Sequence, residues 1–177
     1  MGFCFFANAV VAARHAQKAH GVHRVAVLDF DVHHGNGTQA CVEDDPTIFF
    51  ASSHQWPCYP GTGHPKERGV GNVCNAILPP GAGGDAFRAV WRDMLLPAMR
   101  AFAPELIVVS AGFDAHADDP LAQLAVDEAD YAWLTERICE AADRHCGGRV
   151  VSLLEGGYDL RALADSTAAH VRCLMRG

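Results

Sequence analysis

The stretch that decides the fold covers residues 25–38 and reads Val-Ala-Val-Leu-Asp-Phe-Asp-Val-His-His-Gly-Asn-Gly-Thr. An apolar run that ends in carboxylates and imidazoles, and then breaks at glycines, is typical of a buried strand with polar groups at its tip. Because side chains alternate between the faces of a strand, we expect Asp29, Asp31 and His33 on one side. Packed together, they need a hydrogen-bond network or a cation as compensation. The tip of this strand is therefore a candidate metal site.

Zinc is the metal that this pattern favours. Aspartate and neutral histidine are ordinary zinc ligands, and a catalytic zinc site has three protein ligands and an open fourth position. Asp31 and His33 supply two, and Asp114, at the end of another hydrophobic run, is the candidate third. Tyr158, at a further strand end, is placed to direct its hydroxyl at a carbonyl polarised by the metal. Taken alone, each residue has a structural explanation as a turn, cap or core residue, but three strand ends at one crevice favour the functional interpretation.

Length and composition predict one globular domain over residues 1–177. Half of the residues are hydrophobic, no apolar run approaches the roughly twenty residues of a membrane span, and the N-terminus lacks a signal peptide. We therefore expect a soluble, cytoplasmic protein. The net charge of −7 argues against nucleic acid binding and is compatible with a cationic substrate. Seven scattered cysteines argue against both a disulfide framework and a zinc ribbon. The oligomeric state stays open.

The order of apolar and amphipathic segments predicts an α/β fold with an open, mostly parallel sheet and helices on both faces. In such sheets the functional crevice lies beyond the carboxyl ends of the strands. Residues 55–71, rich in Pro, Gly and His, predict a long ordered loop. The expected strands cover about residues 24–30, 47–51, 72–78, 105–111 and 149–154. The expected helices cover residues 4–20, 38–43, 85–102, about 127–146 and 159–175.

Helix ends and buried faces can be predicted as well. Gly21 should stop the first helix, while Asp85 and Asp127 should cap the third and fourth. Pro97 should kink the third helix or split it in two. In the first helix the expected buried stripe is Phe6, Val10, Ala13 and Ala16. In the third it is Phe87, Val90, Met94, Leu95 and Phe102.

The remaining histidines are weaker candidates for chemistry. We expect His34, His54, His64 and His116 to be hydrogen-bonding loop residues or neighbours of the ligands. A second metal site formed by His15, His20 and His23 is not favoured, because their spacing is irregular and a solvated surface explains them.

Four motifs identify a family resemblance that covers nearly the whole chain. They are Asp29-Phe30-Asp31-Val32-His33-His34-Gly35-Asn36-Gly37, Tyr59-Pro60-Gly61-Thr62-Gly63, Ala111-Gly112-Phe113-Asp114 with Asp119-Pro120, and Leu154-Glu155-Gly156-Gly157-Tyr158. Together they strongly resemble the zinc-dependent histone deacetylase family, which includes bacterial histone deacetylase-like and acetylpolyamine amidohydrolases. The last motif and the Phe-Cys-Phe-Phe opening are most similar to the class II branch.

The resemblance implies an arginase-deacetylase type of fold and one zinc ion per chain. It implies Asp31, His33 and Asp114 as the zinc ligands and Tyr158 as the hydroxyl that stabilises the oxyanion. Asp29 would be the partner of a catalytic histidine. The implied substrate is an acetylated lysine peptide or an acetylpolyamine, which is hydrolysed to acetate and a free amine.

The resemblance also implies a potassium ion beside the zinc and a narrow tube for the substrate side chain. The implied potassium-binding residues are Asp29, Asp31, His33, Ser52 and Ser53. The implied substrate-binding residues are Gly2, Phe3, Tyr59, Gly156 and Gly157.

One departure from the family pattern affects the expected activity. Family members carry a tandem His-His pair shortly before the Gly-Phe-Cys segment, whereas this sequence begins with Met1-Gly2-Phe3-Cys4. We therefore expect an N-terminally truncated deacetylase fragment, with an exposed edge strand, that binds zinc but hydrolyses slowly or not at all. Two alternatives stay open. One is an arginase-like hydrolase with two manganese ions. The other is a non-catalytic chain, either a degenerate module that binds zinc and acetylated ligands or an unfolded gene remnant.

Overall fold

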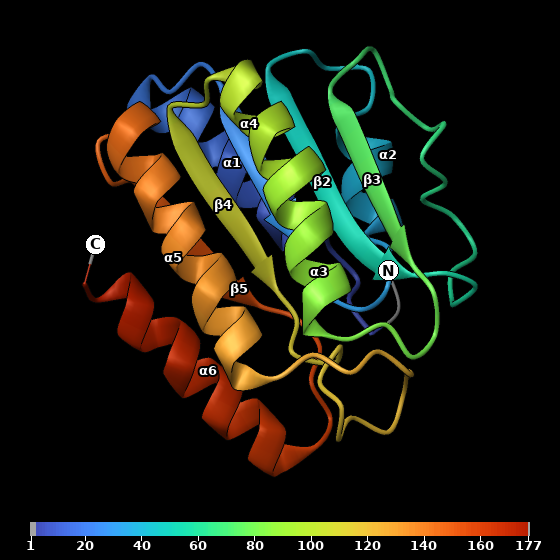
Figure 1. Cartoon of the computed structure of the whole chain (residues 1–177). Coiled ribbons are helices and arrows are strands. Elements are labelled where there is room, and N and C mark those ends of the chain that lie inside the picture. Colours follow the sequence, from blue (N-terminus) through green and yellow to red (C-terminus); the bar gives the residue numbers. More distant parts are fainter. Residues whose placement is uncertain (1–2, 177) are drawn as a thin grey trace.

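A five-stranded, all-parallel sheet forms the centre of the molecule (Figure 1). This computed structural model describes residues 3–176. The strands stand in the order β3-β2-β1-β4-β5, so the first strand of the chain lies in the middle. Their bounds are β1 Val25–Asp29, β2 Ile48–Gln55, β3 Val73–Leu78, β4 Leu106–Ala111 and β5 Val150–Leu154.

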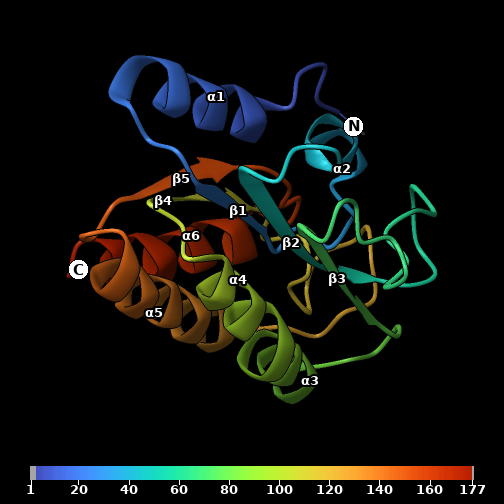
Figure 2. The ribbon, with the colours of Figure 1, turned by 90° about the horizontal axis from the view of Figure 1, so that it is seen from above.

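Helices cover both faces of the sheet, as predicted (Figure 2). On one face lie α1 (Asn8–His20) and α2 (Asn36–Val42). The helices on the other face are α3 (Gly84–Val90), the π-helical segment η1 (Trp91–Leu95), α4 (Leu96–Phe102), α5 (Glu128–His145) and α6 (Leu160–Leu174).

Strand β1 is the core of the sheet, and all five of its residues are buried. Val25 and Val27 pack in the cluster beneath α1, whereas Leu28 packs in the larger cluster on the opposite face. A strand that is covered on both faces needs apolar residues at every position, which explains the continuous run in the sequence. Strand β5, at the edge, is only partly buried, and Val151 and Leu154 are 43% and 62% exposed.

The strand register brings the polar strand ends together. Asp29, the last residue of β1, stands opposite Ser52 of β2 and Ser110 of β4. Because all strands run in the same direction, the segments that follow β1, β4 and β5 leave the sheet at the same edge. This edge is where the sequence places its candidate metal ligands and Tyr158.

The start of α1 and the end of β2 differ from the prediction. Helix α1 begins at Asn8, because residues 3–6 form turns and bends at the mouth of a cavity, and Phe6 is 76% exposed instead of lying on the buried stripe. Strand β2 continues to Gln55, since its polar last residues pair with β3 inside the sheet. Gly21 ends α1 in the left-handed conformation, as predicted.

The third predicted helix also differs in detail. A bridge to Ala125 fixes Gly83 in an extended conformation, so α3 starts after Gly83 and Asp85 lies in its first turn instead of capping it. The π-helical turn η1 shifts the buried stripe, so Met94 is 38% exposed. Pro97 lies in the first turn of α4, directly after this irregular turn.

Asp127 caps α5 as predicted, in a reciprocal capping box with Asp130. Within residues 3–176, no helix has both the length and the apolar character needed to cross a membrane.

Candidate metal centre

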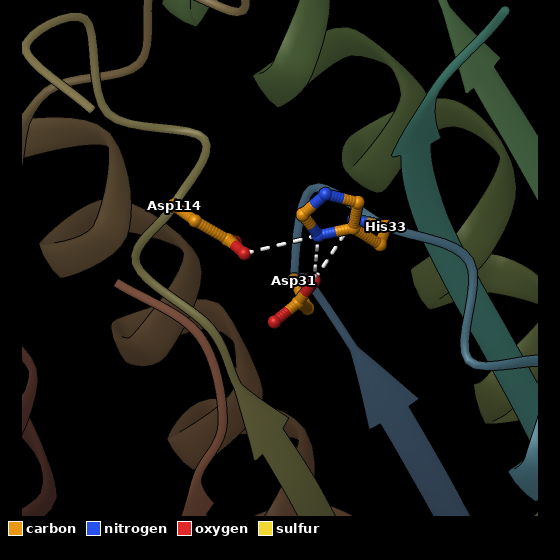
Figure 3. Close-up of side chains that lie close together, drawn as sticks. All are labelled: Asp31, His33 and Asp114. Carbon is orange, nitrogen blue, oxygen red and sulfur yellow. Dashed lines mark hydrogen bonds and ion pairs between the residues drawn. The ribbon is translucent and has the colours of Figure 1, made fainter. Parts of the chain in front are cut away.

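Three side chains from the segments that follow two neighbouring strands converge at the carboxyl edge of the sheet. Asp31 and His33 lie in the bend after β1, and Asp114 lies just after β4. Figure 3 shows the three side chains directed at one place. The Nδ1 atom of His33 is 3.1 Å from Asp31 Oδ1 and 3.1 Å from Asp114 Oδ2. One ligand atom from each residue lies within 4.8 Å of the others, so a single ion can contact all three.

The two carboxylates of this triad favour a positive charge beside them. Hydrogen bonds to the Asp114 and Asp31 carboxylates raise the pKa of His33 from 6.5 to about 10. Burial, followed by the Asp31 carboxylate, raises the pKa of Asp114 from 3.8 to about 7. Without a metal ion, protonated His33 supplies this positive charge. A metal ion bound between the carboxylates would take its place. Two carboxylate oxygens and one imidazole nitrogen fit zinc, and in the described part of the chain no other such group of residues is found.

Backbone groups hold the two carboxylates in place. Val32 N–H donates to Asp114 Oδ1 at 2.8 Å, and Gly156 N–H donates to Asp31 Oδ2 at 2.9 Å. A Cβ atom at Gly156 would collide with the Asp114 and Asp31 carboxylates, and one at Gly112 would collide with Asp31. Two glycines are therefore needed here because the backbone passes directly against the ligand side chains.

Tyr158 follows β5 and lines the same cavity as Asp31 and His33. The residue is 39% exposed, and its ring meets the ring of Phe3 edge-on, at a centroid distance of 5.8 Å. Burial and the nearby Asp114 and Asp31 carboxylates raise the pKa of Tyr158 from 10 to about 12. The hydroxyl thus keeps its proton at neutral pH and remains a hydrogen-bond donor.

A cavity of about 540 Å³ opens above the triad. Its mouth is apolar: Phe3, Tyr59 and Leu121 are 80%, 59% and 45% exposed, and the Tyr59 ring meets the His33 ring edge-on at 6.4 Å. Its deeper part is lined by polar and acidic groups. Gly2, an expected substrate contact, lies outside the described residues. The polar lining residues are Cys4, Asn8, Asp29, Asp31, His33, His34, Asn36, Thr38, Ser110 and Glu155.

Asp29 lies deep in this cavity and is 4% exposed. Its Oδ1 accepts from Asp31 N–H at 3.1 Å, and burial, followed by the Asp31 carboxylate, raises the pKa of Asp29 well above its usual range. Ser52 stands beside Asp29, whereas the Ser53 hydroxyl accepts from the Trp91 indole at 3.0 Å on the other face of the sheet. The Ser53 hydroxyl thus points away from Asp29, so only the backbone of Ser53 could contribute to a potassium site there. Potassium binding stays a prediction.

Two of the weaker histidine candidates hold the long loop after β2. His34 contacts Thr62 Oγ1 at 2.8 Å and Gln39 Oε1 at 2.9 Å, and His54 contacts Gly63 O at 3.0 Å. The two rings lie 4.8 Å apart. Both of these histidines are engaged in hydrogen bonds away from the triad.

Sequence reasoning missed three residues of the site. Glu155 lines the cavity, and burial together with the Asp31 carboxylate raises its pKa. Its place at a strand end, directly before two glycines, was the available signal. Leu121 at the mouth and the buried Asp119 lie on the loop after β4, where no periodic pattern marks them.

Fold and site together define an α/β domain with a metal-binding cavity at the carboxyl edge of a parallel sheet. Residues 1–174 match the family model of the histone deacetylase domain, and the chain belongs to this family. The solved structure described as the HDA15 HD domain superimposes with a TM-score of 0.91 and 38% identity, covering 99% of this chain and 50% of that one. This likeness confirms the predicted arginase-deacetylase fold.

Two curated relatives illustrate the range of the family. "Histone deacetylase 14, chloroplastic" of Arabidopsis thaliana is 48% identical over 179 residues, which cover 99% of this chain and 42% of the relative. "Polyamine deacetylase HDAC10" of Homo sapiens is 40% identical over 184 residues, which cover 98% of this chain and 27% of the relative. The chain thus spans less than half the length of both.

Proposed function

We propose that this chain forms the metal-binding part of a zinc-dependent deacetylase that hydrolyses acetyl amides. The observation that carries the proposal is the convergence of Asp31, His33 and Asp114 on one point beside a cavity that Asp31, His33 and Tyr158 line. Membership in the histone deacetylase family supports this function over that of an arginase-like hydrolase with two manganese ions.

Each residue of the site then has a chemical role. Bound zinc would polarise the acetyl carbonyl and lower the pKa of a water molecule. Tyr158, protonated at neutral pH, donates a hydrogen bond to the carbonyl oxygen as negative charge develops on it. Asp29, buried at the inner end of the cavity, is suited to orient an imidazole that takes a proton from water. A potassium ion at Asp29 and Ser52 would offset the buried carboxylate.

The shape of the cavity supports an acylated amine on a long aliphatic stem as the substrate. Phe3 and Tyr59 present apolar rings at the mouth, and the metal ligands lie below them. Acetyl-lysine in a peptide and an acetylpolyamine both have such a stem. The names of the relatives include both a histone deacetylase and a polyamine deacetylase, so both substrate classes belong in the first assay.

We propose further that residues 1–177 alone turn over substrate slowly or not at all. A general base is needed to take the proton of the attacking water. Among the described residues that line the cavity, His34 is the one imidazole besides His33, and both of its ring nitrogens are engaged by Thr62 and Gln39. This observation also favours a second candidate function, a module that binds zinc and acetylated ligands without hydrolysing them.

Zinc stoichiometry and hydrolysis of a fluorogenic acetyl-lysine peptide, with and without a chelator, test the proposal. Asp114→Ala should abolish zinc binding, while Asp118→Ala, which removes a carboxylate that is 76% exposed four residues away, should not. One zinc per chain with slow, chelator-sensitive turnover supports a deacetylase. Peptide binding without any turnover supports the binding module. The absence of zinc binding would refute both, and rapid turnover by the unmodified chain would refute the need for a further base.

A further inference from the structure

One buried carboxylate outside the triad links the mouth of the cavity to Tyr158. Asp119 is 6% exposed and lies on the loop between β4 and α5. Its Oδ2 accepts from the backbone N–H of Tyr158 at 2.7 Å, and its Oδ1 accepts from the backbone N–H of Leu121 at 3.0 Å. One oxygen thus contacts a segment 39 residues later in the chain, and the other contacts the backbone two residues later.

This pair of contacts needs a carboxylate. Two N–H donors arrive at two different oxygens, and an asparagine side chain offers only one oxygen acceptor. Within residues 3–176, no ion pair of Asp119 with a cationic side chain is found, so backbone donors compensate its buried charge. A side chain that only stabilised a turn would need one of these contacts, and the second contact goes to the segment that carries the proposed catalytic hydroxyl.

Tyr158 depends on this contact because little else anchors it. The two residues before it are glycines, and Gly157 has a φ of 139°, a conformation that only glycine adopts readily. Gly156 is fixed through Phe113 N–H, which donates to its carbonyl at 2.7 Å. The ring of Tyr158 makes an edge-on contact with Phe3, and the residue as a whole is 39% exposed. The Asp119 hydrogen bond is thus the anchor at the tyrosine itself.

The loop that carries Asp119 is itself held firmly. Gln123 and Gln55, at the end of β2, form a reciprocal pair: Gln55 Nε2 donates to Gln123 Oε1 at 2.6 Å, and Gln123 N–H donates to Gln55 Oε1 at 2.7 Å. Gln55 is 3% exposed. In Figure 1 this loop runs beside the segment that joins β5 to α6. Because Gln123 fixes this loop to the end of β2, Asp119 on the same loop can hold the backbone of Tyr158 in a defined place.

We propose that Asp119 is a positioning residue that sets the place of the Tyr158 hydroxyl relative to Leu121 at the mouth of the cavity. The inference rests on the role given to Tyr158 under the proposed function. The printed hydrogen bonds of the Asp119 side chain go to Tyr158 and Leu121 and not to the three ligand side chains, so we expect its effect on the hydroxyl and not on metal binding. A substrate stem that packs against Leu121 and a carbonyl that meets Tyr158 are then aligned by the same carboxylate.

Amide hydrogen exchange tests the two hydrogen bonds of Asp119 to Tyr158 and Leu121, here called the clamp, without any activity assay. Asp119→Asn should speed exchange at the Tyr158 or Leu121 amide at least tenfold, while core amides of β1 and β4 keep their protection. Asp118→Asn is the matched control, since it makes the same change of charge one residue away on a side chain that is 76% exposed. Leu121→Pro, which removes the N–H donor at the mouth, is a second variant and should also speed exchange at Tyr158. Unchanged exchange at Tyr158 in both clamp variants would overturn the inference.

A double-mutant cycle tests the positioning role. With zinc bound, Asp119→Asn should weaken binding of an acetyl-lysine peptide about tenfold in the unmodified chain and less than twofold in a chain that already carries Tyr158→Phe. Zinc stoichiometry should stay at one. Equal losses in both backgrounds would show a merely structural role and overturn the inference. If zinc binding fails, or if Tyr158→Phe has no effect alone, the proposed function fails, and the exchange data still report on the clamp.

Discussion

Acid should destabilise this domain through His170, a buried histidine of α6. Thr135 Oγ1 donates to Tyr131 O at 2.6 Å, so this hydroxyl accepts from His170 Nδ1–H at 2.7 Å. The other ring nitrogen then accepts from the Ser152 hydroxyl at 2.8 Å. The neutral ring is thus fully hydrogen-bonded, and a second proton would place a charge in a site that is 3% exposed. Burial accordingly lowers the pKa of His170 from 6.5 to about 4.

The sign and size of the effect follow from this pKa. Between pH 6.5 and 4 the unfolded chain binds the proton more readily than the folded one, so the free energy of unfolding falls as the pH falls through this window. At about 1.4 kcal/mol per pKa unit, the loss is about 2 kcal/mol at pH 5 and about 3 kcal/mol below pH 4. The His170 ring packs against Phe30 and Phe113. These residues directly precede Asp31 and Asp114, so the loss of stability should also affect the segments that carry these two ligands.

Urea unfolding at pH 7.5 and pH 5 measures this effect. We expect the unmodified chain to lose about 2 kcal/mol more than His170→Gln between these pH values. The lowered pKa of His54, about 4, contributes equally to both proteins and cancels. His145→Gln, at an exposed site on α5, is the control and should behave as the unmodified chain does. Parallel pH dependence of the unmodified chain and His170→Gln would refute the assignment of the acid sensitivity to His170.

Three further predictions concern the site. Gly156→Ala should lower zinc affinity at least tenfold, because the added Cβ would displace the ligand carboxylates, while Gly83→Ala, whose Cβ would meet Ala125 O at 3.4 Å, should leave calorimetric affinity unchanged. Tyr158→Phe should retain zinc but reduce any measurable turnover about a hundredfold; an unaffected rate would exclude the hydroxyl from the reaction. Removing zinc with a chelator should lower the unfolding free energy by about 2.7 kcal/mol relative to zinc at a hundred times its dissociation constant, and Asp114→Ala should show no such difference.

The strands could be predicted because their apolar runs are continuous and their breaks are rich in glycine and proline. Strand order could not, since pairing depends on contacts between distant segments. The polar end of β2 was missed for a related reason: Ser52 and His54 are buried only because β1 and β3 flank them. The exposed Met94 reflects a π-helical turn that a regular helical period does not foresee.

The candidate ligands could be predicted because Asp31, His33 and Asp114 each follow a strand, and parallel strands end at one edge. The structure brings these three side chains together, while their identity as zinc ligands stays a prediction. Asp119 carried no such signal, although it lies in a quoted motif. Its function depends on Tyr158, 39 residues later, and only the folded chain brings the two together.

Strand β1 is fully buried and strand β5 only partly, so the parts of the site that follow them should unfold at different urea concentrations. The triad follows β1 and β4, whose residues are all buried, whereas Tyr158 follows an edge strand that is only partly covered. Local opening costs least where burial is least. As urea increases, the edge should therefore detach before the centre, leaving a species that retains its metal ion but has lost the tyrosine. Any measurable hydrolysis should therefore cease at a lower urea concentration than that at which zinc is released.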